Sequence, residues 1–287
     1  MIKNLVFSAG GTRCIAYISI LNYIENNAEL FNIQNISASS GGSIYALCFC
    51  LGYTFKDMKE LSMNMTSERI CDLRLTDFFE NYGLDSGKKI EQFIKLIIKK
   101  KKNDEDMNFI QFYEKYKINL IINGTNLKTR KTEYFSYKTH PDMPIFIAVK
   151  ISCAVPFYYK YVTYNNQDYI DGGLLDFYPI SQFEDDIDDT LGFLIETNHY
   201  DKTYKNNFGL FILNFIDCIT SNLNEKYKKY EHRTIFLNCQ SMNNENEILS
   251  GLEFNLSKKV IAQIIENSYE IICKSMDNYI LKDNDKS

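Results

Sequence analysis

The chain has 287 residues and a mass of 33.6 kDa, which is enough for a large domain with a closed active site and excludes a peptide hormone or a disulfide-stapled miniprotein. Hydrophobic residues make up 45% of the chain and charged residues 24%, so the composition excludes a disordered protein and a bundle of membrane helices. The net charge of -5 argues against a general nucleic-acid-binding protein, which needs a basic surface to bind phosphates.

The first two units of the pattern each consist of a strand, a turn of small residues and a helix. An apolar strand over residues 3–7 leads into a glycine-containing turn, and helical spacing of apolar residues resumes over 15–24. A second strand over 33–38 leads through another small-residue turn into a buried helix over 44–51. Two successive units of this kind predict a parallel sheet with helices packed against it.

The rest of the chain continues as a single α/β domain. Residues 54–116 are charged and helical in pattern, which predicts a helical insertion or lid. Further strands are expected at 118–122, 133–137, 158–170, 191–196 and 234–238, and further helices at 145–154, 208–223 and 256–281. Neither an internal repeat nor a linker interrupts this pattern.

Two turns carry residues that suit nucleophilic chemistry. Ser40 lies in the turn Ala38-Ser39-Ser40-Gly41-Gly42, where a strand meets a helix and a hydroxyl can project above the sheet. The Gly10-Gly11 turn follows the preceding strand, so its backbone amides should lie at the same sheet edge and can form an oxyanion hole, with Arg13 adding positive charge. The alternatives are an ordinary Ser/Gly turn and a structural glycine turn with a solvated arginine.

A third turn supplies a candidate base. Asp171 ends a strand and precedes Gly172 and Gly173, so the chain turns abruptly and the carboxylate can face a cleft. A carboxylate that lies close to a serine and is partly desolvated can accept its proton. A turn aspartate without chemistry is the alternative.

Taken in order, these motifs resemble those of the patatin-like phospholipases. FSAGGTRCIAYISIL resembles the glycine-rich oxyanion motif of that family, SASSGGSIYAL its nucleophile elbow, and DGGLLDFYPI its aspartate motif. The resemblance implies an α/β fold, a three-layer sandwich with a mainly parallel central sheet, helices on both faces and a helical insertion. It implies a family core over residues 2–182, with 183–287 completing the same domain.

The resemblance also implies a lipid acyl hydrolase of phospholipase A or lysophospholipase type that forms an acyl-enzyme and needs neither metal nor cofactor. Its substrate would be a phospholipid or another acyl-ester lipid. The implied roles are Ser40 as nucleophile, Asp171 as general base, Gly10, Gly11, Thr12 and Arg13 as the oxyanion and substrate-binding loop, and Ala38, Gly42, Gly172 and Gly173 as supports of the two turns. Ala9, Cys14 and Ala38 stand where the family motifs usually have glycine.

Two other functions remain open from the residues. A Ser-His-Asp esterase could use one of the three histidines, His140, His199 or His232, but an elbow after only the second strand leaves too little sheet before the nucleophile for that fold. A catalytically inactive lipid-binding or interaction protein with the same fold is the other alternative.

Remaining patterns bear on location and partners. Without a recognisable secretion signal, and with eight scattered cysteines that suit buried thiols, the chain is expected to be cytoplasmic and peripheral to membranes, without a nucleic-acid partner. The basic run 99–102 beside the amphipathic stretch 88–98 is either a headgroup-binding site or a solvated face. The acidic run 184–189 indicates an exposed loop rather than a calcium site, and 208–215 a core helix rather than an acyl channel.

Overall fold

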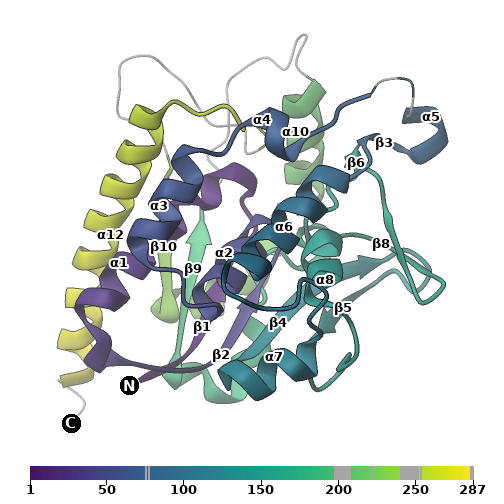
Figure 1. Cartoon of the computed structure of the whole chain (residues 1–287). Helices are drawn as coiled ribbons and strands as arrows, with labels where there is room; N and C mark the ends of the chain where they lie inside the picture. Colours follow the sequence, from purple (N-terminus) through teal and green to yellow (C-terminus); the bar gives the residue numbers. More distant parts are fainter. Residues whose placement is uncertain are drawn as a thin grey trace.

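The computed structural model describes residues 1–74, 76, 78–196, 208–220, 223–239, 252 and 254–284. Figure 1 shows a central sheet with helices on both faces. The strand order in this sheet is β10-β9-β1-β2-β4-β8-β7, with β5 also paired to β4. The expected three-layer α/β sandwich is confirmed.

Most strands of the sheet run parallel, as the two strand-turn-helix units predict. The parallel strands are β1 (Ile2–Phe7), β2 (Phe31–Ala38), β4 (Asn119–Asn126), β9 (Thr190–Ile195) and β10 (Thr234–Leu237). Three further strands pair antiparallel: β5 (Lys131–Phe135) and β8 (Gln167–Asp171) each with β4, and β7 (Val162–Tyr164) with β8. The expected strand over 158–170 is therefore three short strands, the first of which, β6 (Phe157–Tyr159), leaves the main sheet to pair with β3 (Gly83–Asp85).

Alternation along the strands divides the core into two layers. Leu5 and Phe7 of β1 face the larger hydrophobic cluster, whereas Val6 between them faces a smaller cluster on the opposite side of the sheet. The larger layer contains η1 (Gly11–Tyr17), α1 (Ile18–Asn26), α2 (Gly41–Cys50), α3 (Phe55–Met63), α6 (Lys88–Lys100), α7 (Phe109–Tyr116), α8 (Ile145–Ser152) and α12 (Lys258–Asn284). The smaller layer contains η4 (Ile180–Asp189), α11 (Asn224–Tyr227) and η6 (Lys228–Arg233). The short helix α9 (Gly173–Asp176) lies against β4.

The insertion is helical, as expected, but it also contains the three-residue strand β3. Its helices are α3, α4 (Ser67–Ile70), α5 (Phe78–Asn81), α6 and α7. Thr54 and Asn108 form capping boxes that start α3 and α7. The first predicted helix begins with the 3-10 segment η1, and a short 3-10 turn, η2 (Ala28–Leu30), precedes β2.

The amphipathic helix α6 uses its apolar side for the core. Ile90, Ile94, Ile97 and Ile98 are all buried, so this side is not available to a bilayer. Around it, lysines of the basic run pair with acidic side chains, as in the contact of Lys101 Nζ with Asp57 at 3.1 Å. Within the described ranges, no helix has both the length and the hydropathy that crossing a membrane requires.

Two other expectations need correction. The acidic run 184–189 lies in the 3-10 segment η4 instead of a plain loop, and three of its residues form ion pairs: Glu184 with Lys229, Asp188 with Arg233, and Asp189 with Lys3. Helix α10 (Phe208–Thr220) is not a core helix throughout, because Phe211 and Phe215 are exposed while Ile212 is buried.

Candidate active site

Ser40 occupies a strained turn between β2 and α2. Its φ of 49° and ψ of -131° fall where non-glycine residues are rarely found, and such a conformation persists only when its surroundings enforce it. The turn places Ser40 in the lining of a cleft, as the strand-to-helix pattern predicts for a nucleophile.

Glycines enforce this turn by letting α2 approach the end of β1. A Cβ on Gly41 would lie 2.6 Å from the carbonyl oxygen of Gly11, and one on Gly42 would lie 2.4 Å from that of Ser8. Ala38, by contrast, lies in regular strand pairing with β1 and β4, where a methyl group fits. Gly42 therefore supports the turn as predicted, and Gly41 is an additional requirement that the predicted set of site residues omits.

Asp171 is held at the end of β8 by backbone contacts. Its N–H donates to the carbonyl oxygen of Ala154 at 2.9 Å, and its own carbonyl accepts the Thr125 hydroxyl at 2.9 Å. The N–H of Gly173 donates to Asp171 Oδ1 at 2.7 Å. A Cβ on Gly172 would lie 2.0 Å from Asn123 Oδ1, so this position also requires glycine.

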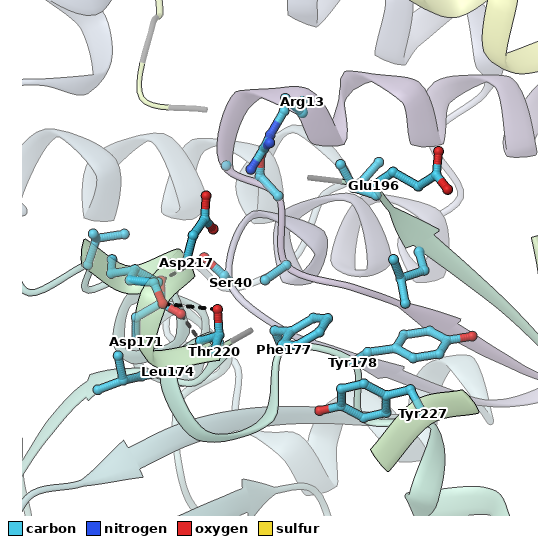
Figure 2. Close-up of a pocket in the computed structure, with 18 of the residues that line it drawn as sticks. Arg13, Ser40, Asp171, Leu174, Phe177, Tyr178, Glu196, Asp217, Thr220 and Tyr227 are labelled. Atoms are coloured by element: carbon cyan, nitrogen blue, oxygen red, sulfur yellow. Dashed lines mark hydrogen bonds between the residues drawn. The ribbon is translucent and has the colours of Figure 1, made fainter. Parts of the chain in front are cut away.

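The two turns bring Ser40 and Asp171 into direct contact. Ser40 Oγ donates to Asp171 Oδ2 at 2.6 Å, and Figure 2 shows both residues in the cleft. Both residues are more than nine-tenths buried. Burial raises the pKa of Asp171 to about 7, against the lowering effect of the hydrogen bonds from Ser40 and Gly173. A carboxyl group with this pKa can take up and release a proton near neutral pH.

A polar bridge connects the two turns underneath. The N–H of Ser40 donates to Ser152 Oγ at 2.8 Å, and the Ser152 hydroxyl donates to Asn123 Oδ1 at 3.4 Å. The amide of Asn123 donates to the carbonyl oxygens of Gly172 at 3.4 Å and Asp176 at 2.6 Å. The sequence pattern contains no signal for Ser152 or Asn123, because each acts through partners distant in the chain.

The glycine loop lies against the start of α2. The N–H groups of Gly10 and Gly11 donate to no acceptor in the part of the chain that the structure describes, and both residues line the cleft with Ser40. Arg13 is buried, and its Nε donates to the carbonyl oxygen of Gly10 at 3.2 Å, so it braces the loop. A Cβ on Gly10 would lie 3.0 Å from Ile195 Cγ1 and 3.1 Å from Cys14 Sγ, so the packing around the loop favours glycine there.

The cleft above Ser40 has a volume of about 550 Å³. Phe177, Tyr178 and Tyr227 line one part of it, as Figure 2 shows. Charged side chains also line it, namely Arg13, Glu196, Asp217, Lys228 and Glu231. The cleft therefore suits a ligand with both polar and apolar parts.

Histidine does not contact Ser40 in the described ranges. His140 packs edge-on against Phe135, His232 is exposed on η6, and neither lines the cleft. His199 lies outside the described residues. Among the residues that are described, no group of three His, Cys, Asp or Glu side chains could hold a metal ion.

Comparison with known proteins agrees with the fold and the motifs. The family model described as patatin-like phospholipase matches residues 5–184, more than half of the chain. The chain is 32% identical to the uncharacterized protein R571 of Acanthamoeba polyphaga mimivirus, over 98% of this chain and 94% of that protein. It is 29% identical to the "Probable lipid hydrolase 463L" of Invertebrate iridescent virus 6, over 62% of each chain.

Solved structures share the fold at low sequence identity. VipD from Legionella pneumophila aligns with a TM-score of 0.63 and 17% identity, over 97% of this chain and 67% of that one. The type III effector protein ExoU aligns with a TM-score of 0.56 and 14% identity, over 97% of this chain and 53% of that one. Together with the match of the family model, the Ser40 elbow, the glycine loop and the Asp171 turn lead to one assignment: the chain belongs to the patatin-like phospholipase family.

Proposed function

We propose that this protein is a lipid acyl hydrolase that cleaves fatty-acyl esters through a Ser40-Asp171 dyad. The observation that carries the proposal is the 2.6 Å hydrogen bond from Ser40 Oγ to Asp171 Oδ2 at the lining of the cleft. Membership of a family of lipid hydrolases supports the choice of an acyl ester as substrate. Phospholipids and lysophospholipids, whose polar and apolar parts match the lining of the cleft, are the proposed substrates.

The first half of the reaction forms an acyl-enzyme. Ser40 Oγ attacks the ester carbonyl carbon while Asp171 Oδ2 takes the hydroxyl proton, and the carbonyl electron pair moves onto its oxygen. The amides of Gly10 and Gly11 and the N-terminus of α2 stabilise this negative charge. The intermediate then collapses, the C–O bond to the alcohol breaks, and the leaving oxygen takes the proton from Asp171.

The second half returns the free enzyme. A water molecule gives a proton to Asp171 while the water oxygen attacks the acyl carbon. The amides of Gly10 and Gly11 also stabilise the oxyanion of this second step. Collapse of this intermediate breaks the bond to Ser40 Oγ, which recovers its proton from Asp171. The fatty acid leaves.

A Ser-His-Asp triad is disfavoured by the direct contact between Ser40 and Asp171, which leaves no imidazole between them. The inactive-protein alternative is disfavoured because both dyad side chains are present and hydrogen-bonded in the cleft. The division at residue 182 and the cytoplasmic location stay predictions.

We also propose that the protein meets its substrate at a lipid surface through the edge of the cleft, not through α6. Phe157 and Phe215 are 43% and 45% exposed, and their rings lie 6.3 Å apart. Their neighbours Pro156 and Asn214 line the cleft. Apolar side chains at the mouth of a lipid-binding cleft can insert between headgroups.

The proposed function is tested with vesicles of mixed phosphatidylcholine and phosphatidylglycerol. The wild-type protein is expected to sediment with the vesicles, to release fatty acid and lysophospholipid, and to be labelled on Ser40 by a fluorophosphonate. Release is measured by mass spectrometry. A folded protein that releases no fatty acid and resists the fluorophosphonate would instead be the inactive lipid-binding protein.

The pH dependence follows from the environment of Asp171. Because burial raises its pKa to about 7, the carboxyl is protonated and cannot act as a base below that pH. We expect kcat/KM for a neutral ester to rise with pH and to level off above a midpoint near pH 7. His232→Gln, a change at an exposed imidazole outside the cleft, should leave the midpoint in place, whereas a midpoint near pH 4 would show that the pKa of Asp171 is not raised.

A further inference from the structure

A second cavity, separate from the wide cleft, also reaches Ser40. It has a volume of about 60 Å³, and Gly11, Ser40 and Val155 line both spaces. The nucleophile and the glycine loop therefore lie at the junction of two cavities. An ester has two substituents on the two sides of its carbonyl group, so a junction at the nucleophile can separate them.

The helical insertion forms one side of the second cavity. Six large apolar side chains of the insertion line it, namely Met58, Leu61, Met65, Ile70, Ile90 and Phe93. They belong to α3, α4 and α6 and to the turn between α3 and α4. No Lys, Arg, Asp or Glu is among the residues that line this cavity in the described part of the chain, whereas six such side chains, including Asp171, line the cleft. Uncharged, apolar walls favour a hydrocarbon chain over a headgroup.

One polar group of this cavity belongs to the glycine loop. Thr12 follows Gly11, is 3% exposed, and its hydroxyl oxygen has no hydrogen-bond partner among the described residues. A buried hydroxyl without a partner is costly, and a polar atom of a ligand would remove that cost. The cavity thus combines a hydroxyl group of the glycine loop with the apolar walls of the insertion. A fatty-acyl ester has a matching arrangement, because its polar carbonyl group is joined to an apolar chain.

We propose that this second cavity binds the acyl chain, that the alcohol half of the ester occupies the wide cleft, and that α3 and α6 set the acyl-chain length. The proposal rests on the proposed acyl-hydrolase function and adds the orientation of the substrate. Each water-sized group needs roughly 10–15 Å³ of cavity volume, so this cavity of about 60 Å³ holds about four to six such groups. Longer chains fit when the flexible side chains of Met58 and Met65 move aside.

The test compares kcat/KM for p-nitrophenyl esters of two, four, eight and twelve carbons. Leu61→Trp fills the cavity and is expected to lower the ratio of kcat/KM for the eight-carbon ester to that for the two-carbon ester by about tenfold or more. Met58→Ala enlarges the cavity and should raise the twelve-to-four-carbon ratio about threefold or more. Leu96→Trp places the same large ring on the exposed side of α6 and should leave both ratios unchanged.

Ratios of kcat/KM between esters of different chain length test the acyl-chain site separately from the Ser40-Asp171 dyad. If the wild-type protein hydrolyses the esters but the ratios stay the same in folded Leu61→Trp and Met58→Ala, the acyl-chain proposal is wrong and the dyad proposal stands. If the wild-type protein hydrolyses no ester, the function proposal fails, and binding of the fluorescent fatty acid cis-parinaric acid decides the cavity proposal. Leu61→Trp, but not Leu96→Trp, should then weaken that binding about tenfold, and equal binding by both variants would overturn the proposal.

Discussion

Ser40→Ala is expected to lower kcat/KM for phospholipid hydrolysis by about 10⁴-fold or more and to abolish fluorophosphonate labelling, because the attacking oxygen is removed. The measurement is fatty-acid release together with the circular dichroism spectrum, which should not change. Alanine keeps the Cβ of the strained turn, so the variant removes only the hydroxyl and its hydrogen bond to Asp171.

The neighbouring serine supplies a matched control. Ser39 is fully buried, its hydroxyl has no hydrogen-bond partner among the described residues, and it does not line the cleft. Ser39→Ala is therefore expected to keep kcat/KM within about twofold of the wild type. Full activity in Ser40→Ala, or equal losses in both variants, would show that the nucleophile lies elsewhere.

Asp171→Asn is expected to lower kcat/KM by about 10²–10⁴-fold at every pH, since an amide cannot accept the serine proton. The shape of the turn is kept, because the asparagine side chain can still accept the hydrogen bond that the N–H of Gly173 donates to Asp171 at 2.7 Å. Asp168→Asn is the matched control and should retain activity. Asp168 lies on the same strand, but its carboxylate accepts a hydrogen bond from Thr163 and does not line the cleft. A wild-type rate in Asp171→Asn would rule out this carboxylate as the base.

Asp171→Asn, which should lower activity, is expected to raise the stability of the folded protein. The pKa of Asp171 is raised from 3.8 to about 7 in the folded protein, so the unfolded chain ionises first and this group lowers stability as pH rises from about 4 to 7. Above pH 7 that loss is complete and constant. Asp171→Asn removes it, so the variant is expected to unfold at a higher Tm than the wild type at pH 8, with a smaller difference at pH 4 in a calorimetric scan.

The strained backbone of Ser40 and the burial that raises the pKa of Asp171 both lower the free energy of unfolding. Hydrogen bonds from the surrounding structure hold both residues in place. The Ser152-Asn123 bridge ties the backbone N–H of Ser40 to the carbonyl of Gly172, so the two turns hold each other in position. Hydrogen bonds of this kind fix the distance between the proposed nucleophile and the proposed base without taking part in proton transfer themselves. The arrangement explains how Ser40 and Asp171 keep their geometry.

Local patterns were sufficient to place Ser40 and Asp171 in tight turns, and the structure brings their side chains into contact. Ser40 and Asp171 each lie in a turn whose neighbours within two residues dictate its shape, so short motifs contain the information. The order of strand, turn and helix in the first two units also predicted the parallel sheet, because such units can pack only in a few ways. The family resemblance then joined three separate turns into one site.

Only the tertiary structure decided which distant segments support and line that site. Ser152 lies 112 residues from Ser40, and no periodicity or spacing relates two positions so far apart. The three-residue strand β3 is too short for an alternation signal, and α6 looks amphipathic whether its apolar side meets a bilayer or the core. The second cavity depends on how α3, α4 and α6 pack together, since a hydrophobic pattern says that a side chain is buried but not which neighbours leave space beside it.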